Sequence, residues 1–393
     1  MAEAATQYVV QFEEGFPRAE VEALGAELMA AGILAPGFIP PSAGLLRLEA
    51  IVYAKDEQGY DTVVLPDRNL VSRMARVARD GHAELKDKTT RSAVALMAYC
   101  QAMQVLLEPS IAFHELGFVL GNSIAREELA WFRAADRVAV LDWVALAAGE
   151  KDRVALGDPA ARSDLDFEKP IARWRRNYVV ALKAAELELT PATAPVDRAM
   201  ALLEWMDKDF LLAGPAALFV SMYYGPKAAR AGLFKQLRSP DREAAIDGAR
   251  NAAWDMTHLS DFVVRVTKAE EQRRRYIFAS GDLSLVRIAS RLFLGPEPAD
   301  GLPSLEQGLQ EWWPNKDAQR LAEAVFALFD IERFRDRPLP NPPPEGIESL
   351  IAKGEAFVGV AAFGPLPVRP YDFDRPAEVM AKLQMLHDLL DGF

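Results

Sequence analysis

The sequence has little cysteine and no long hydrophobic run, and each absence excludes some classes of protein. Its single cysteine, Cys100, excludes an internal disulfide and any zinc site built from several thiolates. No apolar run reaches the roughly 18 residues that a membrane-spanning helix needs. The opening segment, MAEAATQYVVQFEEG, lacks the basic flank and apolar core of a signal peptide. The sequence therefore predicts a cytoplasmic protein that does not enter a membrane.

Net positive charge is also missing, because 57 acidic residues outnumber 45 Lys and Arg and give a net charge of −12. Binding along a phosphate backbone needs clustered positive charge, so this balance counts against a simple DNA-binding module. It counts less against a nuclease, whose carboxylates are partly offset by bound cations.

Histidine is scarce as well, and the four that are present show no spacing typical of metal ligands. His114 and His258 stand beside acidic residues, but adjacent positions on a helix face different directions. The sequence therefore favours carboxylates over imidazoles as the residues that carry any chemistry.

The apolar residues that are present predict strands alternating with helices, which is typical of a parallel sheet with crossover helices. The strand-like runs are at residues 8–12, 45–53, 62–65, 105–107 and 276–280. Helical spacing is clearest at residues 18–31, 69–79, 90–104, 110–120, 251–268, 283–294, 318–329 and 377–390. Residues 35–44, rich in Pro and Gly, are expected to form a loop.

These elements divide the chain into an α/β core, a helical insertion and two extensions. The expected segments are an N-terminal α/β extension at 1–57, a core formed by 58–120 and 243–295, a helical insertion at 121–242, and a helical C-terminal extension at 296–393. The insertion is rich in Ala, Leu and charged residues, so we expect it to add no strand to the sheet.

Four acidic residues stand where α/β proteins usually place their chemistry. Asp67 directly follows an apolar strand, and Asp282 follows the run YIFAS in the same manner. Ligands bind beyond the carboxyl ends of the strands in open α/β sheets. Glu115 lies in a helix with apolar neighbours, and Asp255 is expected in the first turns of a helix, where its charge is favourable.

A cluster of carboxylates without Cys or His suits a hard divalent cation. Mg²⁺ and Mn²⁺ prefer oxygen ligands, and two such ions activate water and stabilise the leaving oxygen in phosphodiester hydrolysis. The same residues also have ordinary structural explanations. Asp67 and Asp282 suit helix N-caps, Glu115 suits a solvated helix face, and Asp255 suits a helix first turn.

Two motifs in the first half of the expected core resemble those of the PIN-domain nucleases. The stretch VVLPDRNLVSRM is similar to that family's apolar strand followed by Asp-x-Asn and a helix, and it aligns Asp67 and Asn69. The stretch EPSIAFHELG is similar to the helix that carries the second acidic residue, which aligns Glu115; Glu108 is the alternative.

Two further motifs follow in the family's order. NAAWDMTHLSDF resembles the helix of the third acidic residue, which aligns Asp255, with Asp261 as the alternative. YIFASGDLSL resembles the strand that ends in Ser-x-Asp, which aligns Ser280 and Asp282. The long stretch of chain between the second and third motifs implies the insertion.

The resemblance implies a PIN-like core and a Mg²⁺- or Mn²⁺-dependent endonuclease that cleaves RNA. Asp67, Glu115, Asp255 and Asp282 would hold metal, and Asn69 and Ser280 would orient them. The remaining alternatives are a DNA-directed, structure-specific nuclease and a non-catalytic helical interaction protein. In an interaction protein, the insertion or the tail would bind a protein partner or a second copy of the chain.

One basic cluster is a weaker candidate for substrate binding. Arg173, Trp174, Arg175 and Arg176 combine cations with an aromatic ring, an arrangement that stacks bases and holds phosphates in single-strand binding proteins. A solvated helix face is the commoner explanation for such a run. The sequence favours that interpretation.

Overall fold

The structure, a computed structural model, combines one small sheet with many helices. It describes residues 10–37, 44–155, 158–159, 163–169, 171–190, 193–211, 213–228, 233–293, 298–328 and 342–360. The described residues up to Gly359 form one compact unit. No helix in the described part of the chain is both long and apolar enough to cross a membrane.

The sheet has four strands in the order β1-β4-β2-β3. Their bounds are Leu34–Pro36 for β1, Asp61–Pro66 for β2, Leu106–Leu107 for β3 and Arg274–Ala279 for β4. Strand β2 runs parallel to both β3 and β4, whereas β1 pairs with β4 in the antiparallel direction. The α/β character expected from the sequence is therefore present, but the sheet is mixed and not purely parallel.

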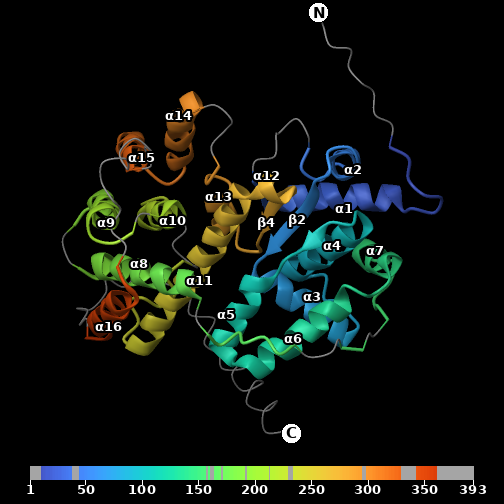
Figure 1. The fold of residues 1–393 in the computed structure, drawn as a ribbon, viewed down its shortest axis with the longest axis horizontal. Coiled ribbons are helices and arrows are strands. Elements are labelled where there is room, and N and C mark those ends of the chain that lie inside the picture. The colour runs from blue at the N-terminus through green and yellow to red at the C-terminus, as the bar shows by residue number, and fades with distance from the viewer. Residues whose placement is uncertain are drawn as a thin grey trace, which may run out of the picture. The chain divides into compact units, whose positions relative to one another are not determined.

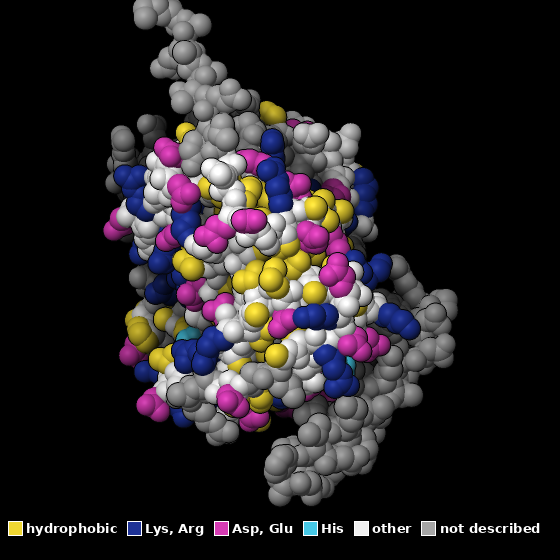
Figure 2. All heavy atoms as spheres, turned by 90° about the vertical axis from the view of Figure 1, so that its right-hand side faces the viewer, with side chains coloured by type: hydrophobic (Ala, Val, Ile, Leu, Met, Phe, Trp, Pro, Cys, Tyr) yellow, Lys and Arg dark blue, Asp and Glu magenta, His cyan; other side chains and the backbone are white. Residues whose placement is uncertain are grey.

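In the described first part of the chain, helices α1 to α7 pack on this sheet or on one another, in the half of Figure 1 that carries their labels. Their bounds are Arg18–Ala31 (α1), Leu48–Asp56 (α2), Arg68–Asp80 (α3), Lys88–Ala102 (α4), Ser110–Leu120 (α5), Asn122–Ala135 (α6) and Val140–Ala148 (α7). One buried apolar cluster runs from α1 through α3 to α7 and reaches Ile277 on β4. On the face of this half that Figure 2 shows, Lys and Arg are interspersed with Asp and Glu around hydrophobic patches.

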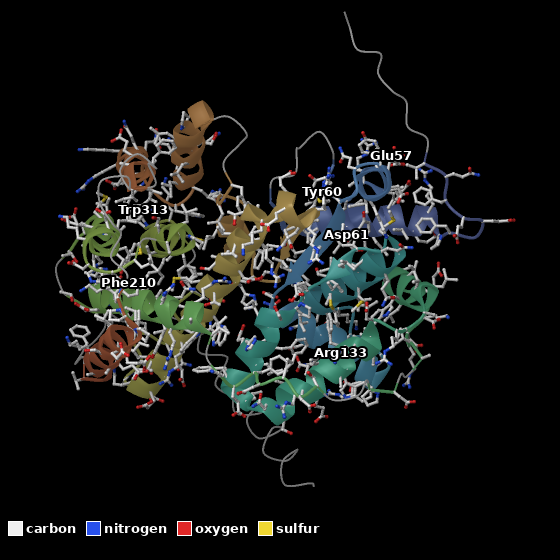
Figure 3. All side chains as sticks on the ribbon, in the orientation of Figure 1. Glu57, Tyr60, Asp61, Arg133, Phe210 and Trp313 are labelled. Carbon is white, nitrogen blue, oxygen red and sulfur yellow. The ribbon has the colours of Figure 1, made fainter. Side chains whose placement is uncertain are left out.

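Among the remaining described helices, α8 and α10 pack directly on α11, whereas α9 and α14 pack on α15. Their bounds are Ala172–Leu189 (α8), Pro195–Lys208 (α9), Gly214–Tyr224 (α10), Arg242–Thr267 (α11), Ala269–Gln272 (α12), Leu283–Ala289 (α13), Pro298–Leu309 (α14), Asn315–Leu328 (α15) and Pro344–Val360 (α16). Phe210 and Trp313 are buried there (Figure 3). Buried Glu188 accepts charged hydrogen bonds from Arg198 and Arg238, each at 2.6 Å.

Aspartate side chains begin several of these helices. Asp67 caps α3, Asp87 caps α4, Asp241 caps α11 and Asp282 caps α13, each by accepting a hydrogen bond from a backbone N–H in the first turn. These bonds satisfy donors that have no partner within the helix. The structural alternative for Asp67 and Asp282, that they are helix caps, is therefore present in the structure. Asp67 directly follows β2, and Asp282 comes three residues after the end of β4.

The N-terminal elements differ from the prediction. Residues 45–53 were expected to form a strand, but Leu48–Asp56 is helix α2, whose buried Leu48, Ile51 and Ala54 recur every third position. Strand β1 lies where a loop was expected. The described residues of the run 8–12 form no strand, and residues 8 and 9 lie outside the described residues.

Residues 121–242 add no strand to the sheet wherever the structure describes them. Helices α6 and α7 of this range pack directly on α3 and α4 and share their apolar core, whereas α8 and α10 pack on α11. Helix α11 begins well before residue 251, the expected start. The helix expected at 377–390 lies outside the described residues.

We predict that Gly248→Ala destabilises the protein. A Cβ at this buried position of α11 would overlap the backbone carbonyl of Lys235, which no side-chain rotation relieves. Overpacking of this kind costs roughly 1–3 kcal/mol, so the midpoint of urea denaturation should fall. Gly359→Ala is the matched control, because its Cβ would meet only Ile246, at 4.0 Å. Equal midpoints for the two variants would contradict this packing.

Candidate functional site

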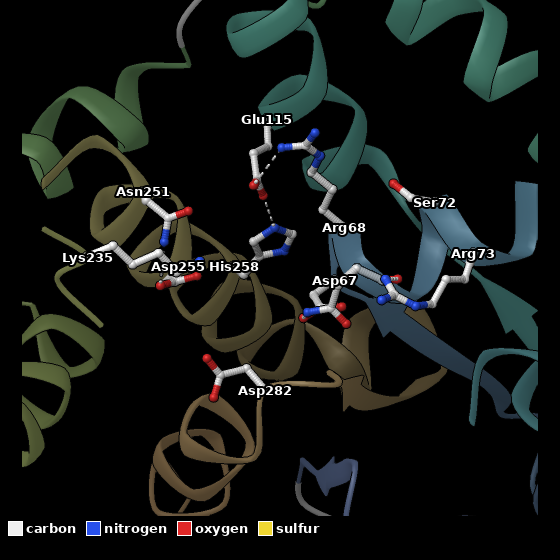
Figure 4. Close-up of a pocket in the computed structure, with 11 residues that line it drawn as sticks. Asp67, Arg68, Ser72, Arg73, Glu115, Lys235, Asn251, Asp255, His258 and Asp282 are labelled. Atoms are coloured by element: carbon white, nitrogen blue, oxygen red, sulfur yellow. Dashed lines mark hydrogen bonds and ion pairs between the residues drawn. The ribbon is translucent and has the colours of Figure 1, made fainter. Parts of the chain in front are cut away.

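A pocket of about 310 Å³ lies where β2 and β4 end (Figure 4). The residues that line it are Asp67, Arg68, Asn69, Ser72, Arg73, Glu115, Lys235, Asn251, Asp255, His258 and Asp282. Four separate segments supply the acidic groups, namely the exits of β2 and β4 and the helices α5 and α11. The structure therefore brings together all four carboxylates singled out from the sequence.

Asp67 is the most firmly held of these carboxylates and is 4% exposed. It accepts hydrogen bonds from the Leu70 N–H at 3.2 Å, from Asn69 Nδ2 at 2.6 Å and from the Ser280 hydroxyl. Burial raises the pKa of Asp67 to about 6, although the Ser280 hydrogen bond and the charge of His258 act in the opposite direction. Asn69 and Ser280 thus contact the carboxylate that they were expected to orient.

One further hydrogen bond ties the exit of β4 to the exit of β2, and another lies within the β4 exit itself. The Asp282 N–H donates to the Ser280 hydroxyl at 2.9 Å, and the Gly281 N–H donates to Asn69 Oδ1 at 3.1 Å. A Cβ at Gly281 would lie 2.5 Å from that same Asn69 oxygen, so glycine permits the close approach. The carboxylate of Asp282, which caps α13, borders the same pocket.

Glu115 is the carboxylate with the most positive surroundings. Its Oε2 lies 3.1 Å from His258 Nε2, and its Oε1 lies 3.5 Å from Arg68 Nη1. Burial alone would raise the pKa of Glu115, but the hydrogen bond and charge of His258, together with Arg68, lower it. Glu115 is therefore held in its ionised form.

Asp255 is in the opposite situation. Burial raises its pKa well above the ordinary value, and the negative charges of Glu115 and Asp282 raise it further, against the positive charge of Lys235. Asn251 Nδ2 donates to it at 3.4 Å. The expectation that a helix N-terminus favours this charge was wrong, because α11 begins at Arg242 and Asp255 lies in its middle.

Sequence reasoning missed several residues of the pocket, above all His258. Asn251, Asp255 and His258 follow one another at spacings of four and three, which place them on one face of α11. This spacing is the feature of the sequence from which His258 could have been predicted to lie beside Asp255. Lys235 had no comparable signal, since it precedes α11 and reaches the pocket through the contact between its backbone and Gly248.

The two alternative acidic residues do not line the pocket. Asp261 forms ion pairs with Arg173 at 2.8 Å and with Arg265 at 2.6 Å. Glu108 lies 3.5 Å from Arg265 and accepts a hydrogen bond from the Ser110 N–H. Both residues therefore have structural partners away from the four carboxylates.

The basic cluster at 173–176 does not present its aromatic ring for base stacking. Trp174 is 4% exposed and packs among Phe118, Tyr178 and Trp254. Arg173 is paired with Asp261, and Arg175 lies 2.9 Å from Glu348. Both interpretations of Trp174, as a weak candidate for base stacking and as part of the favoured solvated helix face, were wrong, because the ring belongs to the core between α8 and α11.

The groups around the pocket fit a hard divalent cation by their chemistry. They offer carboxylate oxygens, and a cation would relieve the repulsion that raises the pKa of Asp255. As the described side chains stand, no three Asp, Glu, His or Cys groups are arranged to hold one ion together. Both oxygens of Glu115 face His258 and Arg68, so Glu115 would have to leave these partners to join the other carboxylates around an ion.

Comparison of the chain with protein-family models, with curated proteins and with solved structures finds no match. The function is therefore inferred from the side chains of this pocket and from the motifs in the sequence.

We predict that Asp255→Asn raises the melting temperature in EDTA at about pH 8. The pKa of Asp255 is higher in the folded protein than in the unfolded chain, so its ionised form costs stability above the folded pKa. This cost disappears below the unfolded value of about 3.9. The gain should therefore shrink as the pH falls. A variant less stable than the parent at about pH 8 would contradict the argument.

Proposed function

We propose that the protein is a Mg²⁺- or Mn²⁺-dependent phosphodiesterase that cleaves single-stranded RNA. The observation that carries the proposal is the meeting of Asp67, Glu115, Asp255 and Asp282 around one pocket. Buried carboxylates that repel one another are typical of functional sites and seldom serve stability. The preference for RNA follows only from the resemblance of the motifs to PIN-domain nucleases.

Asp67, Asp255 and Asp282 would hold the metal, with Glu115 as a fourth ligand. A bound divalent ion supplies positive charge to the phosphate and lowers the pKa of a coordinated water. The all-oxygen donor set favours Mg²⁺ or Mn²⁺ over zinc.

The other lining residues have separate tasks. Asn69 and Ser280 fix the orientation of the Asp67 carboxylate, since both donate hydrogen bonds to it. His258 and Arg68 keep Glu115 ionised. Arg68, Arg73 and Lys235 place positive charge at the same pocket, where a phosphodiester would meet it.

Two alternatives remain. A DNA-directed nuclease would use the same carboxylates, and comparison of RNA with DNA of equal sequence distinguishes the two. A non-catalytic interaction protein is favoured by one specific observation, namely that Asp67 and Asp282 already act as helix caps. Cap residues alone would not bind Mn²⁺, so stabilisation by the ion separates this alternative from the proposal.

We predict that Asp67→Asn abolishes Mn²⁺-dependent cleavage of single-stranded RNA and leaves the fold intact. Asparagine can still cap α3, but it lacks the charge that attracts a cation. A bound ion contributes several kcal/mol to the transition state, so the rate should fall by roughly a hundredfold or more. Melting in EDTA should be unchanged or slightly improved, because a buried charge is removed.

Asp261→Asn provides the matched control, since this carboxylate lies in α11 but is paired with arginines and does not line the pocket. It should lose some stability and keep both cleavage and the Mn²⁺-induced rise in melting temperature. If the wild type shows neither cleavage nor Mn²⁺ stabilisation, the proposed function is wrong. If the Asp67→Asn variant cleaves RNA as fast as the wild type, Asp67 is not part of the site.

A further inference from the structure

A second pocket, of about 170 Å³, lies between α3 and α6 beside the carboxylate pocket. Its lining residues are Ser72, Ala75, Arg76, Arg79, Ile124, Glu127, Glu128 and Trp131. Ser72 lines both pockets, so the two are neighbours along α3. Nothing in the proposed chemistry uses this second pocket.

Helix α3 connects the two pockets with a row of polar side chains. Arg68, Ser72, Arg76 and Arg79 follow one another at spacings of four, four and three, which place them on one face of the helix. At 1.5 Å per residue, Arg76 lies about 12 Å beyond Arg68 along the axis. Arg68 is paired with Glu115 at 3.5 Å and Arg79 with Asp80 at 2.8 Å. Exposed Arg76 lies between them, where a guanidinium suits the backbone of a single strand that continues past the cleaved bond.

The second pocket itself combines an apolar wall with polar groups. Trp131 is partly buried against the core and also lines the pocket, and Ile124 is 41% exposed beside it. Ser72 donates a hydrogen bond to Glu128 at 2.7 Å, which uses one of the several acceptor positions of that carboxylate. Exposed Arg76 adds a cation at the rim. A flat aromatic ring next to hydrogen-bonding groups and a cation matches the chemistry of one nucleotide.

We propose that this second pocket holds an unpaired nucleobase of the strand whose phosphodiester lies in the carboxylate pocket. The base stacks on Trp131 with its polar edge toward Glu128, and Arg76 contacts a phosphate of the same strand. The inference rests on the proposed function and deepens it, since it makes an unstacked single strand the substrate. A duplex keeps its bases stacked and cannot place one there.

Binding to two ligands tests the proposal. One ligand is a short single-stranded RNA, and the other is a sugar-phosphate backbone of the same length without bases. Both are titrated into Asp255→Asn, in which cleavage is expected to be blocked, and into the double variant that also carries Trp131→Ala. Base stacking on an aromatic residue corresponds to a roughly five- to 150-fold change in affinity. We expect a loss of this size for the RNA and none for the backbone ligand.

Three further variants make the test specific. Trp131→Phe keeps an aromatic ring and should retain most of the affinity for RNA, whereas a purely structural role for Trp131 predicts equal losses for both ligands. Arg76→Ala should weaken binding of both ligands. Arg133→Ala, an exposed arginine of α6 outside the second pocket (Figure 3), should weaken neither.

The outcomes distinguish this inference from the proposed function. Equal effects of Trp131→Ala on the two ligands would overturn the nucleobase pocket, even if the wild type is stabilised by Mn²⁺ and cleaves RNA. A selective loss for RNA supports it. Lack of Mn²⁺ stabilisation and of cleavage in the wild type would instead remove the proposed function, whatever the ligand comparison gives. Tighter binding of duplex than of single-stranded RNA would also overturn the inference.

Discussion

The parallel pairing of β2 with β4 is the interaction on which the rest of the site depends. The two strands are paired from Asp61 and Arg274 to Pro66 and Ala279, and the Asp67 N–H continues the ladder by donating to the Ala279 carbonyl at 2.9 Å. Two distant parts of the chain therefore end side by side at one edge of the sheet. A slip of one residue would turn the side chains of one strand to the opposite face, so the buried apolar residues that fix this register also fix the position of the carboxylates.

The carboxylates of the pocket differ in how well nearby positive charges and hydrogen bonds offset their negative charge. Glu115 is stabilised as an anion by His258 and Arg68, whereas Asp255 is buried among other negative charges. Surroundings that push the pKa values of neighbouring carboxyl groups apart assign them different protonation behaviour. The fold bears this repulsion because the hydrogen bonds across the two strand ends and the core of α11 hold the backbone in place. Such a site costs stability, and proteins commonly accept that cost where chemistry or ligand binding requires it.

Part of this arrangement was predictable from the sequence, and the physical reason differs from residue to residue. Asp67 and Asp282 each follow a short apolar run and begin a helix, which is a local signature that does not depend on the rest of the chain. Strand β1 has three residues in a segment rich in Pro and Gly, so its pairing with β4 leaves no periodic pattern to detect. The presence of His258 in the pocket could not be predicted without knowing which face of α11 points inward. The presence of Lys235 in the pocket depends on a contact with Gly248, which only the folded chain displays.

The wide separation of the two paired strands also has a consequence for synthesis. Ser280 and Asp67, which share a hydrogen bond, are 213 residues apart in the chain. Ribosomes add about 5–20 residues per second, so roughly 10–40 seconds pass between the emergence of the first carboxylate and that of the last. During that interval β2 is without β4, its neighbour on one side, and the acidic cluster is incomplete. A nascent chain would therefore carry no assembled site until Asp282 and the strand before it have emerged.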